Sequence, residues 1–143
     1  MKTHQNILVA VDLTEEARQV LQRAIELAGF YKARLHLIHV VEPVGLNSPY
    51  ELSPALPTDM LSALQQRAEN FLEQLANDLQ LKDTTRTVGV GSLKQSIFDE
   101  VKAKKVDLIV IGTHGRHGIE LLLGSTATSV LHGTPCDVYA VRI

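Results

Sequence analysis

Apolar and polar positions along this chain follow two kinds of pattern. Five short runs are rich in branched apolar residues and have the length of strands: 6–11, 34–41, 84–90, 106–111 and 137–143. The runs 6–11 and 106–111 are apolar at nearly every position, which is typical of strands that are buried on both faces of a parallel sheet, whereas 84–90 alternates. The pattern therefore predicts five strands.

The segments between the strands place apolar residues at helical spacing. They predict four helices: one over 14–31 with Thr14 as its N-cap, one over 58–79, one that begins at Gly91-Ser92, and one over 125–131 that stops before Gly133 and Pro135. In the helix over 58–79, Met60, Leu64 and Leu72 are among the apolar residues expected to face a core. Residues 42–57 contain four prolines and a glycine and predict a loop.

The order of these elements predicts the fold class. A strand, a helix and a strand within about 35 residues form a right-handed βαβ unit. The whole pattern predicts an α/β fold in one domain over residues 1–143: a doubly wound, five-stranded parallel sheet with four helices on both faces. In such sheets, ligands bind beyond the carboxyl ends of the strands, where the strand order reverses.

Composition narrows the class of protein. The chain has 143 residues, of which 45% are hydrophobic, and this fits one compact domain. A formal net charge of −2 gives no basic field, so we expect no nucleic-acid partner. Cys136 is the single cysteine, which excludes an internal disulfide or a CxxC site. We also expect no membrane association and a cytoplasmic location, because no signal region or run of about 20 apolar residues is present.

Glycines surround a candidate phosphate site. Gly112 follows the apolar strand 106–111, and Gly115 and Gly118 come directly after it. Glycine lets the backbone approach a ligand closely and adopt positive φ. The run Gly124-Ser125-Thr126 then opens the next helix, whose free N–H groups attract an anion. We predict that these two glycine turns flank one phosphate pocket.

Other strand ends meet at the same edge of the predicted sheet. Asp12 follows the first strand, Val40 lies at the end of the second, and Gly112 ends the fourth. A carboxylate, strand-end backbone groups and a phosphate cradle together would suit a nucleotide. Asp12 could instead serve as a turn or N-cap residue, and His114 could contact phosphate or cap its own turn.

The remaining histidines and Arg116 have simpler interpretations. Arg116 and His117 could neutralise terminal phosphates or lie on the solvated surface. His36 and His39 occupy a strand that is predicted to be buried, which favours hydrogen-bonded core or strand-end histidines. The motifs GxGxxG after the first strand, GxxxxGK[ST], GxSxG and HExxH are absent from the sequence. We therefore name no catalytic residue and no metal ligand.

Several segments together resemble the universal stress protein family. They are Asn6-Ile-Leu-Val-Ala-Val-Asp12, Leu37-Ile-His-Val-Val41, Asp107-Leu-Ile-Val-Ile-Gly-Thr-His-Gly115, Leu122-Leu-Gly-Ser-Thr126 and Pro135-Cys-Asp-Val-Tyr-Ala-Val141. The resemblance spans essentially the whole chain. ATP-binding members carry the motif G-x2-G-x9-G-[S/T], which Gly112, Gly115, Gly124 and Ser125 match. Gly115 and Gly124 are, however, separated by eight residues, one fewer than in that motif.

The resemblance implies a function and the residues that carry it. Asp12 and the backbone of Val40 would recognise adenine, and Gly112 would adjoin the ribose. The phosphates would be held by Gly115, Gly124, Ser125 and Thr126, with His114 in the turn between them. The family is usually dimeric through its last strand, and the apolar run 138–141 would suit that role.

These features favour a stress-response regulatory protein that binds ATP, or ADP or AMP, as a homodimer, with Mg²⁺ as a candidate bridge between phosphates. One alternative is a dimeric interaction module that needs no nucleotide. Another is a slow ATPase, although no pairing of nucleophile and base in the sequence points to rapid hydrolysis.

Overall fold

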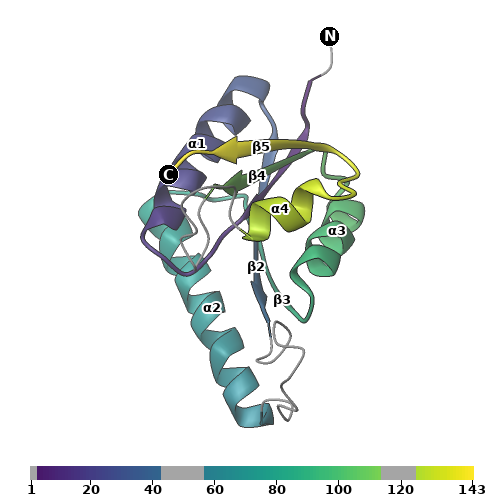
Figure 1. The fold of residues 1–143 in the computed structure, drawn as a ribbon. Coiled ribbons are helices and arrows are strands. Elements are labelled where there is room, and N and C mark those ends of the chain that lie inside the picture. Colours follow the sequence, from purple (N-terminus) through teal and green to yellow (C-terminus); the bar gives the residue numbers. More distant parts are fainter. Residues whose placement is uncertain (1–2, 43–56, 114–124) are drawn as a thin grey trace.

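A computed structural model describes residues 3–42, 57–113 and 125–143 of the protein. In these residues, five strands alternate with four helices (Figure 1). The elements are β1 (Asn6–Ala10), α1 (Glu16–Tyr31), β2 (Arg34–Val41), α2 (Thr58–Asp78), β3 (Thr85–Val90), α3 (Leu93–Lys104), β4 (Leu108–Gly112), α4 (Ser125–Leu131) and β5 (Asp137–Val141). The alternation of strands and helices predicted from the sequence is confirmed.

All five strands are parallel and form one sheet in the order β3-β2-β1-β4-β5. The central strand β1 pairs with β2 on one side, where Ala10 lies opposite Ile38, and with β4 on the other, where Val9 lies opposite Val110. The chain moves outward from β1 to β3, then returns to the far side of β1 for β4 and β5. The strand order therefore reverses at β1, which makes the carboxyl end of this strand the topological switch point.

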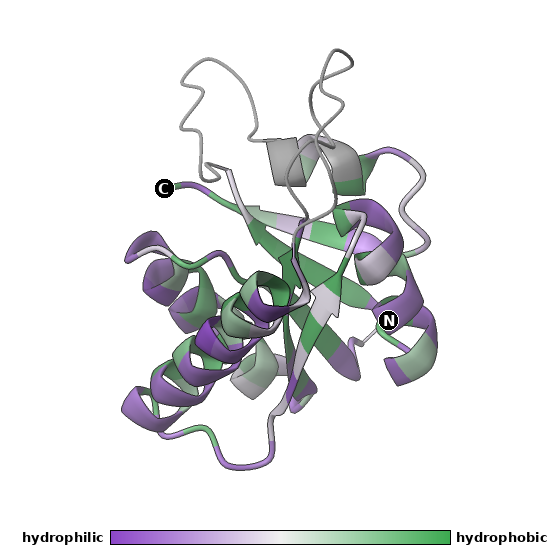
Figure 2. Cartoon of the chain, turned by 90° about the horizontal axis from the view of Figure 1, so that it is seen from below, coloured by the Kyte–Doolittle hydropathy of each residue, from purple (hydrophilic) through white to green (hydrophobic). Residues whose placement is uncertain are grey.

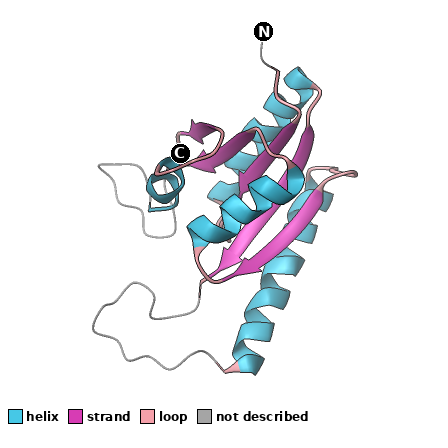
Figure 3. Ribbon diagram, turned by 90° about the vertical axis from the view of Figure 1, so that its right-hand side faces the viewer, coloured by secondary structure: helices cyan, strands magenta, loops and turns pink. Residues whose placement is uncertain are grey.

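The helices cover both faces of the sheet (Figure 3). One core lies between the sheet and α1 with α2, and includes Ile7, Leu21 and Leu72. The other lies between the sheet and α3 with α4, and includes Leu8, Ile97 and Val130. Figure 2 shows the apolar strands enclosed by helices whose outer surfaces are polar. The doubly wound architecture thus follows from strands that are apolar on both faces.

The predicted boundaries agree with the structure to within two residues for most elements, and those of β2 and α4 agree at both ends. The predicted start of α3 at Gly91-Ser92 agrees with its first residue, Leu93. The structure adds that Ser92 caps this helix, since its side chain accepts a hydrogen bond from the N–H of Gln95 at 3.3 Å. The predicted loop over 42–57 lies almost entirely outside the described residues.

Two predictions about helices are wrong. Thr14 does not cap α1, because Glu15 occupies the N-cap position and makes no side-chain cap bond. The early part of α2 does not face a core, since Met60 and Leu64 are exposed. Figures 1 and 3 show why: α2 extends past the ends of β2 and β3, so its first turns have no sheet to cover.

Candidate functional site

The carboxyl ends of β1, β2 and β4 bring three of the predicted site residues to one edge of the sheet. Asp12 lies two residues beyond the end of β1, Val40 is the second-to-last residue of β2, and Gly112 is the last residue of β4. Because Val9 lies opposite Val110, the chain positions two residues further along, Val11 and Gly112, flank the switch point. The sequence prediction placed these residues at this edge, and the structure agrees.

Asp12 is half-buried, and its carboxylate is held by its own loop. The hydroxyl of Thr14 donates a hydrogen bond to Asp12 Oδ1 at 2.6 Å. This short bond to a charged acceptor explains why Thr14 does not cap α1, since its side chain is engaged with Asp12. A carboxylate has two oxygens and about four acceptor positions, so this bond uses only part of its capacity.

The pairing of β1 with β2 ends at Val11. The N–H of Val11 donates to the carbonyl of Ile38 at 2.8 Å, which is the ladder bond expected from the register of Ala10 with Ile38. Because backbone groups along a strand alternate between its two sides, the N–H and C=O of Val40 also face the β1 side. They lie beyond the last pair of the ladder, on the same edge as Asp12.

His39 makes the next contact along this edge. Its Nδ1 lies 2.7 Å from the carbonyl oxygen of Val11, and its side chain is buried. A carbonyl oxygen can only accept a hydrogen bond, so Nδ1 carries the hydrogen and donates it. The sequence indicated a hydrogen-bonded histidine at this position, but not that its partner is the residue before Asp12.

Gly112 is held in the sheet by its pairing with β5. It lies opposite Val141, and the next residue, Thr113, donates its N–H to the Val141 carbonyl at 2.9 Å. Gly112 does not use the positive φ that glycine allows, because the glycines with positive φ among the described residues are Gly91 and Gly133. An extended glycine at the end of β4 removes a side chain from the switch point.

The phosphate part of the predicted site is only partly described. His114, Gly115, Arg116, His117 and Gly124 lie outside the described residues. Ser125 and Thr126 form the start of α4, as the sequence predicted. The roles assigned to these residues stay predictions.

His36 is the second buried histidine of β2 and lies near the opposite end of the strand. Its Nδ1 is 2.8 Å from Thr85 Oγ1, and its Nε2 is 3.1 Å from Asn6 Oδ1. Burial lowers the pKa of His36 below its ordinary value, Lys104 and Arg34 lower it further, and Glu100 raises it. A neutral ring that bonds neighbouring strands fits the prediction of a core histidine.

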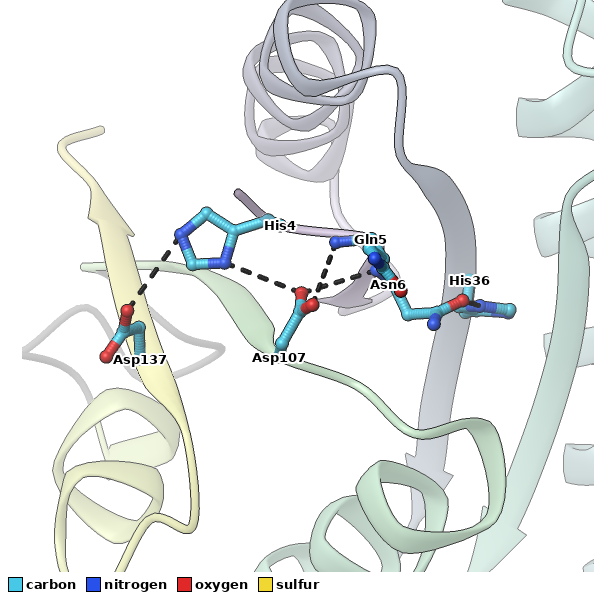
Figure 4. Close-up of polar contacts among 6 residues, drawn as sticks. All are labelled: His4, Gln5, Asn6, His36, Asp107 and Asp137. Carbon is cyan, nitrogen blue, oxygen red and sulfur yellow. Dashed lines mark hydrogen bonds and ion pairs between the residues drawn. The ribbon is translucent and has the colours of Figure 1, made fainter. Parts of the chain in front are cut away.

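The amino-terminal edge of the sheet carries a separate polar network (Figure 4). The Asp107 carboxylate accepts hydrogen bonds from the N–H groups of Gln5 at 2.8 Å and Asn6 at 3.3 Å. His4 lies between two carboxylates, with Nδ1 3.4 Å from Asp107 and Nε2 3.9 Å from Asp137. This network ties β1 to β4 and β5 at the end remote from the switch point, so its contacts serve the fold.

Neither edge offers a metal centre within the part of the chain that the structure describes. There, no group of three or more His, Cys, Asp and Glu side chains could hold a metal ion. No described helix is long and apolar enough to cross a membrane. The switch point instead offers a carboxylate and strand-end backbone groups, which suit hydrogen bonding to a flat polar ligand.

Comparisons with known proteins identify the family and the fold. The model of the universal stress protein family matches residues 3–142. Universal stress protein A homolog 2 of Coxiella burnetii is 39% identical over 145 residues, which cover 100% of this chain and 98% of that protein. The structure of universal stress protein UspA from Lactobacillus plantarum has a TM-score of 0.82 at 26% identity, covering 99% of this chain and 100% of that one.

A structure of lower sequence identity contains a ligand. It is the crystal structure of a universal stress protein in complex with cAMP, with a TM-score of 0.63 and 19% identity. The match covers 99% of this chain and 98% of that one. At this identity the likeness shows the fold alone.

Proposed function

The chain belongs to the universal stress protein family, and from that premise we propose that it is a cytoplasmic stress-response regulator that binds ATP or a related adenine nucleotide as a homodimer. The observation that carries the proposal is the end of the β1–β2 ladder. Asp12 lies there with a carboxylate, and the backbone groups of Val40 face the same edge beyond the last ladder bond to Ile38.

These groups match the chemistry of adenine. The base presents an amino donor next to ring-nitrogen acceptors. The Asp12 carboxylate and the Val40 carbonyl can accept from the amino group, and the Val40 N–H can donate to a ring nitrogen. A universal stress protein of the same fold has been crystallised with cAMP, which contains this base, and this supports an adenine ligand.

The ribose and phosphates would extend from the base toward β4 and α4. Gly112 would adjoin the ribose, since an extended glycine leaves room beside the strand. Gly115, Gly124, Ser125 and Thr126 would hold the phosphates with His114 in the turn, as the family resemblance implies. Mg²⁺ would bind chiefly through phosphate oxygens, because this ion commonly needs few protein ligands beside a nucleotide.

The homodimer would form through β5, which is an edge of the sheet. Tyr139 is 37% exposed and Ala140 is exposed, whereas Val141 is buried. An unpaired edge with apolar side chains tends to pair with another strand. Sedimentation equilibrium should therefore give twice the monomer mass of 15.7 kDa. A monomer at micromolar concentration would contradict this part of the proposal.

The same edge favours one alternative, a dimeric interaction module that needs no nucleotide. Such a protein would purify without nucleotide, and added ATP would leave its thermal unfolding unchanged. A slow ATPase is a further alternative and would yield ADP in a single-turnover assay, whereas a pure binding protein would return ATP intact.

A bulky residue at position 124 tests the site assignment. We expect Gly124→Leu to abolish ATP binding in calorimetry while the far-UV circular dichroism spectrum stays unchanged. Gly29→Leu is the matched control, because Gly29 lies near the end of α1 and an added Cβ there would meet nothing within 4 Å. An ATP affinity that Gly124→Leu leaves unchanged would refute the assignment.

A further inference from the structure

We propose that His39 is a positioning residue for the base: its ring ends the β1–β2 ladder at Val11 and so keeps the backbone of Val40 available beside Asp12. The proposal rests on the proposed function and assigns a task to a buried side chain that nucleotide binding does not otherwise require. Its basis is the hydrogen bond between His39 Nδ1 and the Val11 carbonyl.

The regular ladder would use the same carbonyl differently. With Ala10 opposite Ile38, the next bond of a parallel ladder would run from the Val40 N–H to the Val11 carbonyl. In the structure, the His39 ring donates to this carbonyl at 2.7 Å. The Val11 carbonyl thus accepts from the His39 side chain, where a continued ladder would have it accept from the Val40 N–H.

This exchange has a consequence for the chain that follows β1. If the ladder continued, Asp12 would become a paired strand residue. The N–H and C=O of Val40 would then form hydrogen bonds to that strand and could not bond a ligand. With His39 as the partner of Val11, the chain leaves the sheet one residue before Asp12. The Asp12 side chain can then bond Thr14 in the loop, as it does at 2.6 Å.

The surroundings of His39 hold its ring in place. The side chain is 5% exposed, and odd-numbered neighbours on β2, Leu35 and Leu37, belong to the core under α1 and α2. Since side chains alternate along a strand, the ring lies on that same face. A donor that is fixed by packing positions its partner more tightly than a mobile surface group would.

Three variants separate positioning from packing. His39→Leu removes the donor, whereas His39→Asn keeps an N–H close to the position of Nδ1. Leu35→Ala is the matched control, because Leu35 is buried on the same face of β2 but near its other end, where Arg34 pairs with Asn6. This control weakens the core without touching the Val11 carbonyl.

Calorimetric titrations with ATP, adenosine and inorganic tripolyphosphate then test the proposal. We expect His39→Leu to weaken ATP and adenosine binding roughly ten- to a hundredfold, as for a lost hydrogen-bonding arrangement at the base. Tripolyphosphate binding should change less than about twofold, and His39→Asn should recover most of the loss. An ATP loss that Leu35→Ala reproduces, or an equal loss for tripolyphosphate, would overturn the proposal.

A second readout needs no nucleotide. In the free wild-type protein, the Val40 amide should exchange with solvent faster than the Ile38 amide, and His39→Leu should slow it as the ladder closes onto Val11. Imidazole nitrogen spectra should show the hydrogen on Nδ1. Wild-type protein that ignores ATP would refute the proposed function, whereas a protected Val40 amide or a ring with hydrogen on Nε2 alone would refute the role of His39.

Discussion

Replacing Asp107 with alanine would remove the carboxylate that joins the start of β1 to β4. This side chain accepts hydrogen bonds from the backbone N–H groups of Gln5 and Asn6, and its Oδ1 lies 3.4 Å from His4 Nδ1 (Figure 4). The Asp107 backbone N–H also donates to the Asn6 carbonyl at 2.9 Å, and this bond would remain. The substitution therefore tests the side-chain contacts alone.

The structure sets the size of the expected loss. A hydrogen bond to a charged group contributes about 1.5–3 kcal/mol, and an ordinary one about 0.5–1.5 kcal/mol. The Gln5 bond is short but exposed, and the Asn6 bond is long at 3.3 Å, so we take the low end of each range. The sum is about 2 kcal/mol, which corresponds to a fall in Tm of about 4–8 °C for a domain of this size.

Urea unfolding followed by circular dichroism at neutral pH would measure this loss. Asp107→Asn, which keeps one acceptor oxygen without the charge, should lose about half as much. Asp137→Asn is the control, because the Asp137 side chain is 58% exposed and 3.9 Å from His4, and a surface pair of this kind is worth less than about 1 kcal/mol. Equal losses for Asp107→Ala and Asp137→Asn would refute the reasoning.

Two further predictions concern β2 and α3. The pKa of His36 is lowered in the folded protein, so between that value and about 6.5 the unfolded chain binds more protons. The stability linked to His36 is thus complete above about pH 6.5 and is lost as the pH falls through the pKa that His36 has in the folded protein. Urea unfolding between pH 5 and 8 should therefore show a free energy of unfolding that depends less on pH for His36→Gln than for the wild type. An equal pH dependence in the two proteins would contradict this. Ser92→Ala should cost about 0.5–1 kcal/mol, because it removes the N-cap bond to Gln95, and no change in the unfolding midpoint would contradict a capping role.

The elements that could be predicted from the sequence are those specified by local pattern. The bounds of β2 follow from a run of strand length that is mostly apolar, and the start of α3 from Gly91-Ser92 placed before residues at helical spacing. The Thr14 hydroxyl can bond either the first N–H groups of α1 or the Asp12 carboxylate. Residue types alone predict the first, a helix cap, whereas the structure shows the bond to Asp12. Periodicity predicts that Met60 faces a core, but it gives only the apolar side of a helix and not where the sheet beneath it ends, and Met60 is exposed.

The candidate site divides in the same way. Asp12, Val40 and Gly112 could be placed at one edge, because carboxyl ends of parallel strands share an edge in any doubly wound sheet. The contact of His39 with Val11 could not be predicted, since it joins residues 28 positions apart and depends on the strand register. The network around Asp107 likewise joins residues about a hundred positions apart.

The central claim is that the switch point of this sheet binds an adenine nucleotide. The most direct test is mass spectrometry of the small molecules released when freshly purified protein is denatured, followed by calorimetric titration of the nucleotide-free protein with ATP and Mg²⁺. The account predicts that adenine nucleotide is recovered, or that ATP binds with saturation at one site per chain. Protein that carries no nucleotide and gives no heat with ATP would contradict it and would favour the interaction module.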